Sequence, residues 1–281
     1  MRKKNKEWRP LRKLFILKVT NISPSSYFHK NLTFIVNGVP FEMIFVKGGT
    51  FIMGCVSKPC GCDIPKFNPA HSITLFDYYI GKYPVTQKLW LIVMGINIRQ
   101  QCKLAFGASL YGEGDYYPMY YINYEDCKAF CSKLNKLLTN QLPKGYKFRL
   151  PTEAQWEYAA YGGKKSKGYK YSGSDYIDRV GWYHGNSKGK IHKVGKKRKN
   201  ELGIYDMSGN IAEWCYDWYD YKYYDTSPSI NPKGPSSGSL RVSRGGSWQS
   251  ISMFGCVSRR GTAIFYDREP AQGFRLCLTN N

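Results

Sequence analysis

The sequence has no run of about 20 apolar residues, the length that a helix needs to cross a bilayer, so we expect no membrane span. The apolar run at residues 14–17 is too short for the core of a signal peptide, and no small-residue cleavage site follows it closely. The nine cysteines are an odd number in a chain without a convincing leader. We therefore expect a cytoplasmic protein with reduced thiols, with display at a surface as the alternative.

The motifs of common enzyme classes are also missing. There is no Gly-rich phosphate loop, no serine nucleophile elbow and no His-Glu-x-x-His pair, and the four histidines are too scattered for a catalytic metal cluster. The closely spaced cysteines Cys55, Cys60 and Cys62 do not have the spacing of a zinc knuckle, and no histidine at ligand spacing completes a site. We expect no zinc there, with a metal site as the open alternative.

Acidic residues are few: 20 Asp and Glu face 42 Lys and Arg, which gives a formal charge of +22. Much of the excess lies at residues 1–13 and 188–199, and neither stretch has an RNA-recognition motif, a zinc-finger spacing or a helix-turn-helix pattern. We expect a solvated basic surface, with contact to a polyanion as the alternative.

What the sequence does have is aromatic residues and glycine, including 24 Tyr and 28 Gly, a composition that favours a loop-rich fold. Residues 1–30 are predicted to be a basic arm, and residues 31–281 one domain. Asn37-Gly38 predicts a hairpin turn between two strands. Helices are predicted at 85–95, from an N-cap at Asn123 to about 138, and at 152–160 with a capping box of Thr152 and Gln155. After Gly162 the helical pattern stops.

Seven motifs then follow one another in a specific order: FVKGGTFIMG, YYIGKYPVTQKLW, YINYEDCKAFCSKLN, FRLPTEAQWEYAA, ELGIYDMSGNIAEWCYDWY, RVSRGGSW and GFRL. In order and spacing, from about Val36 to Leu278, the chain resembles the formylglycine-generating-enzyme (sulfatase-modifying factor) family. The resemblance implies an α+β, C-type-lectin-like domain with high loop content and a ligand or substrate groove near the C-terminal segment.

The family's enzymes oxidise a sulfatase cysteine with oxygen and a copper(I) ion, which two cysteines hold shortly after the Gly-Gly-Ser-aromatic motif. Two soft thiolates suit Cu(I). Here the corresponding stretch contains only Cys256, and Cys277 lies beyond the motif in the terminal strand. We interpret Cys256 as a buried apolar residue and expect neither copper nor catalysis. The alternative is a copper- and oxygen-dependent formylglycine-generating oxidase.

The resemblance also implies a structural Ca²⁺ site in the string DMSGNIAE. By position, the carboxylates of Asp206 and Glu213 and the carbonyls of Gly209 and Ile211 would be the ligands, a hard-oxygen set that suits calcium. The alternative is structural: Asp206 caps the turn, and Glu213 pairs with a nearby arginine.

The arrangement RGGSW, a following stretch and a closing GFRL is similar to the variable proteins of diversity-generating retroelements. That resemblance implies a ligand-binding surface near the C-terminus for an unidentified protein or glycan, with aromatic side chains on display. The alternative is a buried irregular strand. The expected contact residues are Trp248, Gln249, Ser250, Ser252, Phe254, Thr262, Ile264, Phe265, Tyr266, Asp267 and Arg268.

Overall fold

The computed structural model describes residues 30–55, 69–105 and 108–280. One compact unit runs from Asn31 to Asn281. Apart from Lys30, the predicted basic arm lies outside the described residues, as do Cys60 and Cys62. No helix within the described ranges is both long and apolar enough to cross a bilayer.

The larger sheet has five strands, and every neighbouring pair in it is antiparallel. Its first turn is the predicted Asn37-Gly38 pair, whose φ angles of 45° and 80° suit the left-handed conformation that such a hairpin requires. In spatial order the strands are β1 (Leu32–Val36), β2 (Val39–Val46), β5 (Tyr78–Gly81), β11 (Cys277–Thr279) and β6 (Lys147–Arg149).

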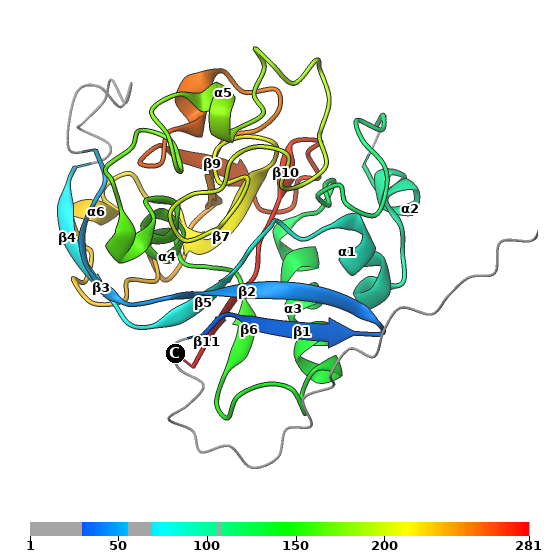
Figure 1. The fold of residues 1–281 in the computed structure, drawn as a ribbon, viewed down its shortest axis with the longest axis horizontal. Helices are drawn as coiled ribbons and strands as arrows, with labels where there is room; N and C mark the ends of the chain where they lie inside the picture. Colours follow the sequence, from blue (N-terminus) through cyan, green and yellow to red (C-terminus); the bar gives the residue numbers. More distant parts are fainter. Residues whose placement is uncertain (1–29, 56–68, 106–107, 281) are drawn as a thin grey trace, which may run out of the picture. The chain divides into compact units, whose positions relative to one another are not determined.

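The second sheet has four strands and includes the last strands before β11 (Figure 1). In spatial order these are β10 (Gln272–Gly273), β7 (Ala212–Trp218), β8 (Leu240–Arg244) and β9 (Arg260–Ile264). The strand β9 pairs with β8 alone, so it forms an edge of this sheet. A separate ribbon joins β3 (Gly49–Met53) to β4 (His71–Leu75).

Two of the three predicted helices begin directly after their predicted N-caps, whereas the first begins two residues later than predicted. Thr86 caps α1 (Gln87–Met94), Asn123 caps α3 (Tyr124–Leu137) and Thr152 caps α4 (Glu153–Ala160), the last two with complete capping boxes. The shorter elements are α2 (Ile98–Cys102), η4 (Gly163–Lys165), α5 (Ile177–Val180), α6 (Tyr223–Thr226) and η5 (Ser252–Gly255).

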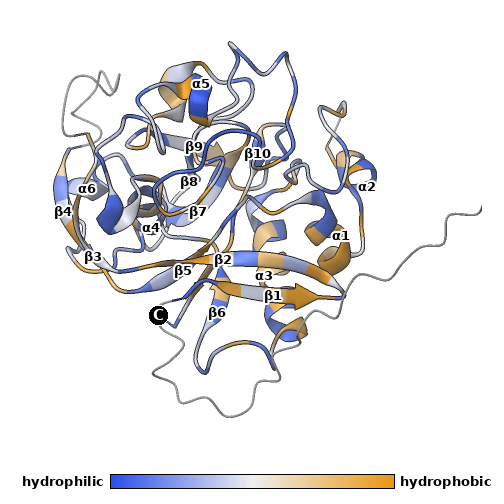
Figure 2. Ribbon diagram, viewed as in Figure 1, coloured by the Kyte–Doolittle hydropathy of each residue, from blue (hydrophilic) through white to orange (hydrophobic). Residues whose placement is uncertain are grey.

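Apolar residues gather on α1, α3 and β2 (Figure 2). There the ring of Trp90 stacks on Phe130 at 5.5 Å, and Phe274 meets Phe130 edge to face. A second core surrounds α4, all of whose residues are buried. The sequence therefore folds into a mixed helix and sheet structure, as predicted.

Charged residues inside the second core connect α4 to the four-stranded sheet. Arg260 of β9 forms a two-bond ion pair with Glu153, at 2.8 and 2.9 Å, and Arg244 of β8 pairs with Glu157. All four side chains are buried. Because removing one partner would leave a buried charge unpaired, this network fixes β8 and β9 against α4.

Candidate ligand-binding surface

The segment that follows β8 begins with a sharp turn. Gly245 and Gly246 have φ angles of 90° and 66°, and a Cβ atom at Gly246 would lie 2.8 Å from the backbone of Phe254. The chain can therefore fold back tightly, and η5 lies directly beside this turn.

Exposure along β9 increases after its first residue. Arg260 is buried in its ion pair with Glu153, whereas Thr262 and Ile264, further along the same face of the strand, are exposed. Beyond the strand, the amide of Asp267 donates to the carbonyl of Ile264 and closes a turn. The strand is thus anchored at its start and open to solvent toward its end.

Most of the expected contact residues are accessible, so the alternative of a buried irregular strand does not describe them. Tyr266 is 62% exposed, Phe254 39% and Ile264 38%. Ile251, which is not among the expected contact residues, is 55% exposed and adds an apolar side chain. The exposed members of the predicted set are Gln249, Phe254, Thr262, Ile264 and Tyr266, and the half-buried members are Ser250, Ser252, Phe265, Asp267 and Arg268.

Trp248 lies beneath this surface, which corrects its selection as a contact residue. Only 6% of it is exposed, its ring packs on Tyr111 at 4.7 Å, and its indole N–H donates to the carbonyl of Pro270. The glycine turn before it directs the chain inward, so Trp248 supports the display segment from below.

Two further members of the predicted set have structural contacts. Arg268 forms an ion pair with Asp126, the residue that completes the capping box of α3. The ring of Phe265 meets Trp218 edge to face, with 5.5 Å between centroids. These contacts fix the turn at the end of β9 and leave Tyr266 pointing away from the core, as its exposure indicates.

The four residues expected to bind calcium do not share one coordination environment. Glu213 is buried, and both of its carboxylate oxygens accept from Arg275, at 2.6 and 2.7 Å; Oε2 also accepts from the indole of Trp156. The carbonyl of Gly209 accepts from the amide of Ile211. A cation would have to displace Arg275 to reach Glu213, so this arrangement matches the structural alternative.

Asp206 is the exception in that set. Its Oδ2 accepts from the amide of Gly195 at 2.7 Å, but its buried Oδ1 has no hydrogen-bond partner among the described residues. Burial, as the main cause, raises the pKa of Asp206 to about 6. Asp206 therefore could supply one oxygen to a cation, but the rest of the predicted set does not fit calcium as it is arranged.

The cysteines do not form the copper-binding pair. Cys256 is buried in a small cluster with Tyr171, Ile177 and Val180, whereas Cys277 lies in the core around α4. Burial raises the pKa of the Cys277 thiol to about 11, which disfavours the thiolate that a metal requires. The described ranges contain no cluster of three or more His, Cys, Asp or Glu side chains that could hold a metal.

Cys55 departs from the expectation of reduced thiols, because it is disulfide-bonded. A metal site made by Cys55, Cys60 and Cys62 cannot use a disulfide sulfur as a thiolate ligand, and the last two residues lie outside the described residues. The compartment therefore does not follow from the cysteines.

Comparison with known proteins gives a consistent set of matches. Residues 36–280 match the model of the sulfatase-modifying factor enzyme 1-like domain. "Chaperone protein LppX" of Paenibacillus barcinonensis is 33% identical over 270 residues, 84% of this chain and 88% of that protein. The formylglycine-generating enzyme of Streptomyces coelicolor is 34% identical over 146 residues, 47% of this chain and 42% of the enzyme. The serine/threonine-protein kinase Pkn1 of Chlamydia trachomatis is 30% identical, but this chain spans about a third of its length (34%).

Among solved structures, Treponema denticola variable protein 1 superposes with a TM-score of 0.75 at 32% identity, covering 88% of this chain and 98% of that one. The motif-based resemblance and the α+β fold that it implied are confirmed by these matches. The similarity to a variable protein therefore extends over most of the chain.

Proposed function

This chain belongs to the sulfatase-modifying factor enzyme 1-like family, and from that premise we propose that it binds a ligand through the surface around β9 and does not oxidise cysteine. The observation that carries the proposal is the contrast within one segment. Its lone thiol, Cys256, is buried against Tyr171 and Ile177, whereas Phe254, Ile264 and Tyr266 are exposed.

An exposed aromatic on a rigid frame is well suited to binding, because little conformational entropy is lost when a partner covers it. The frame here is the buried ion pair between Arg260 and Glu153, which holds the edge strand. Ile251, Ile264 and Tyr266 add apolar area of the kind that forms binding hot spots. The ligand is a protein or a glycan.

The similarity to Treponema denticola variable protein 1 supports a further element of this proposal. Side chains between Trp248 and Gly273 vary among copies of the gene, while buried residues such as Arg260 and Trp248 stay the same. A retroelement that rewrites adenine-bearing codons would produce such a pattern. Sequencing this segment in many cells of one population tests it: changes confined to adenines in the codons of exposed residues support it, and an invariant segment contradicts it.

Binding itself is tested on arrays of glycans and of folded surface proteins, with the intact chain as the probe. A matched variant in which Phe254, Ile264 and Tyr266 are replaced by Ser removes the apolar surface but leaves the Arg260 ion pair. We expect a ligand that the wild type retains and the variant loses. A ligand retained equally by both would place binding elsewhere.

The competing function is oxidation of a sulfatase cysteine with copper and oxygen. It requires Cu(I) binding together with oxygen consumption in the presence of a peptide that carries a sulfatase-type cysteine motif. Turnover in that assay would overturn the binding proposal, whereas its absence together with a ligand on the arrays would support it.

A further inference from the structure

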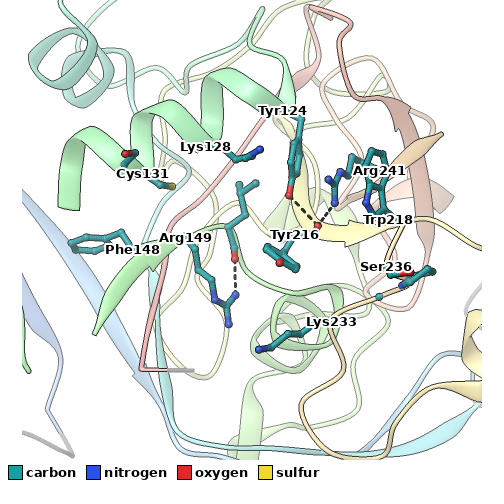
Figure 3. A pocket seen from close by; sticks show the side chains of 14 residues that line it. Tyr124, Lys128, Cys131, Phe148, Arg149, Tyr216, Trp218, Lys233, Ser236 and Arg241 are labelled. Carbon is teal, nitrogen blue, oxygen red and sulfur yellow. Dashed lines mark hydrogen bonds between the residues drawn. The ribbon is translucent and has the colours of Figure 1, made fainter. Parts of the chain in front are cut away.

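A pocket is formed by residues other than the exposed ones around β9 (Gln249, Phe254, Thr262, Ile264 and Tyr266), which we call the display surface (Figure 3). It has a volume of about 590 Å³ and lies among α3, β6, β7, β8 and the loop at 233–236. That volume is within the range of roughly 300–1,000 Å³ that is usual for small-molecule sites. Phe265, just beyond β9, adjoins this pocket: its ring meets Trp218 edge to face, and its carbonyl accepts from the amide of Tyr124.

All the charged residues that line the pocket are positive. Four cations line it, Lys128, Arg149, Lys233 and Arg241, and the lining contains no Asp or Glu. Within the ranges that the structure describes, neither Arg149, Lys233 nor Arg241 forms an ion pair with a carboxylate. Lys128 pairs with Glu125, but both side chains are more than half exposed, so the pair adds little stability.

Arg241 is held in place without a counter-charge. Its guanidinium lies over the rings of Tyr124 and Trp218, at 4.0 and 3.4 Å from their centroids, and donates to the carbonyl of Tyr216. Its Nε is buried and has no hydrogen-bond partner among the described residues. Burial is the main cause that lowers the pKa of Arg241, so its surroundings do not fully compensate its charge.

An aromatic wall adjoins these cations. Tyr216 is 41% exposed, Trp218 is half-buried, and the rings of Tyr124 and Phe148 lie beneath. Arg149 lies over the Tyr216 ring at 5.9 Å and donates to the carbonyl of Leu150 (Figure 3). The apolar C–H face of a sugar ring can lie on this wall while an anionic substituent of the ring faces the guanidinium groups.

We propose that this pocket binds an acidic sugar, whose sulfate or carboxylate group pairs with Arg241 and Arg149 and whose ring packs on Tyr216 and Trp218. Guanidinium groups bind carboxylates and tetrahedral oxyanions with charge-assisted, often bidentate hydrogen bonds. The hydroxyls of Ser132 and Ser236, which also line the pocket, can exchange hydrogen bonds with sugar hydroxyls. The helix end that reaches the pocket, at Tyr124 of α3, is already capped by Asn123, and the amide of Tyr124 donates to the carbonyl of Phe265. The lining also has no carboxylate to pair with a nucleotide base or ribose, which favours a sugar over a nucleotide.

The test is calorimetric titration of the intact protein at one fixed ionic strength. The probes are a sulfated disaccharide, a disaccharide that carries only a carboxylate, and a neutral disaccharide of the same ring size. We expect the neutral sugar to bind at least about 10-fold more weakly than an acidic one, and the two acidic probes to show which oxyanion the pocket prefers. If no acidic disaccharide binds, the proposal is wrong.

Variants then locate the binding. Arg149→Gln and Lys233→Gln are each expected to weaken binding about 3- to 10-fold, and Arg241→Gln more than about 10-fold. Lys167→Gln is the matched control, because it removes the same charge from an exposed residue that does not line the pocket. Equal losses in Lys167→Gln and Lys233→Gln would mean non-specific attraction and overturn the proposal.

A failed fold must be distinguished from lost binding, and the pocket from the display surface. Because Arg241 lies between two rings, its variant could lose its fold, and Arg149→Gln and Lys233→Gln then decide. Tyr266→Ser, on the display surface, is expected to bind the acidic sugar as the wild type does. Unchanged binding in Arg149→Gln and Lys233→Gln would place the sugar outside this pocket, whatever ligand the display surface binds.

Discussion

Arg275 binds both carboxylate oxygens of Glu213, with 2.6 Å from Nε to Oε2 and 2.7 Å from Nη2 to Oε1, and both side chains are buried. Arg275 also donates to the carbonyls of Gly81 and Tyr205. One guanidinium thus connects β5, the 205–213 segment and the terminal segment. Arg275 thus takes up both oxygens of Glu213, the carboxylate that the family resemblance assigns to calcium.

The first prediction concerns this pair. Glu213→Gln leaves the Arg275 charge buried without its counter-ion, so we expect the free energy of unfolding to fall by about 3–5 kcal/mol. Urea unfolding followed by far-UV circular dichroism measures this change. A loss below about 1 kcal/mol would show that the pair does not hold these segments together.

Asp206 gives the second prediction. Burial raises its pKa to about 6 from an ordinary value near 4, so the folded state binds this proton more tightly than the unfolded state. Its contribution is therefore most favourable below about pH 4 and is lost as the pH rises through 6. Asp206→Asn removes the free-energy cost of burying the ionised carboxylate above about pH 6. Asparagine adopts a φ of 56° readily, and its amide oxygen can still accept from the amide of Gly195.

We expect Asp206→Asn to be more stable than the wild type at pH 7.5 by about 1–3 kcal/mol, with the difference shrinking toward pH 5. Thermal unfolding across that pH range, with and without calcium, measures it. The calcium prediction would instead be supported if calcium stabilised the wild type at pH 7.5 and had no effect on the variant.

Local features of this fold could be predicted from sequence because they depend on few residues. Asn37-Gly38 determines a turn by itself, and Asn123 and Thr152 satisfy the amides that begin their helices. The short helix α2 was not predicted, although Asn97 and Gln100 form a capping box there. A five-residue helix has too little apolar periodicity to be recognised.

The sites were harder to predict because they depend on which strands become neighbours. The acidic-sugar pocket combines Tyr124, Arg149, Tyr216, Lys233 and Arg241, which come from elements far apart in the sequence. The alternation of Tyr216 and Trp218 in β7 was the only local signal, since residues two apart share a face of a strand. Trp248 was predicted to contact the ligand but is buried, because the direction of its side chain depends on the glycine turn before it.

The third prediction concerns Cys256. Because this thiol is packed against Tyr171 and Ile177, we expect Cys256→Ala to bind Cu(I) as the wild type does, with neither protein competing against a chromogenic chelator. Titration in the presence of that chelator, under anaerobic conditions, measures the affinity. Tight binding by the wild type that Cys256→Ala abolishes would restore the oxidase as the function.

The last prediction separates the display surface from its frame. Ile264→Ser and Tyr266→Ser change exposed side chains, so each is expected to alter the free energy of unfolding by less than about 1 kcal/mol. Arg260→Ala, four residues before Ile264 on the same strand, leaves Glu153 buried and unpaired and is expected to cost about 3–5 kcal/mol. Chemical unfolding of the three variants measures the difference. If Ile264→Ser costs as much as Arg260→Ala, the end of β9 is part of the core, and it would not be available to bind a ligand.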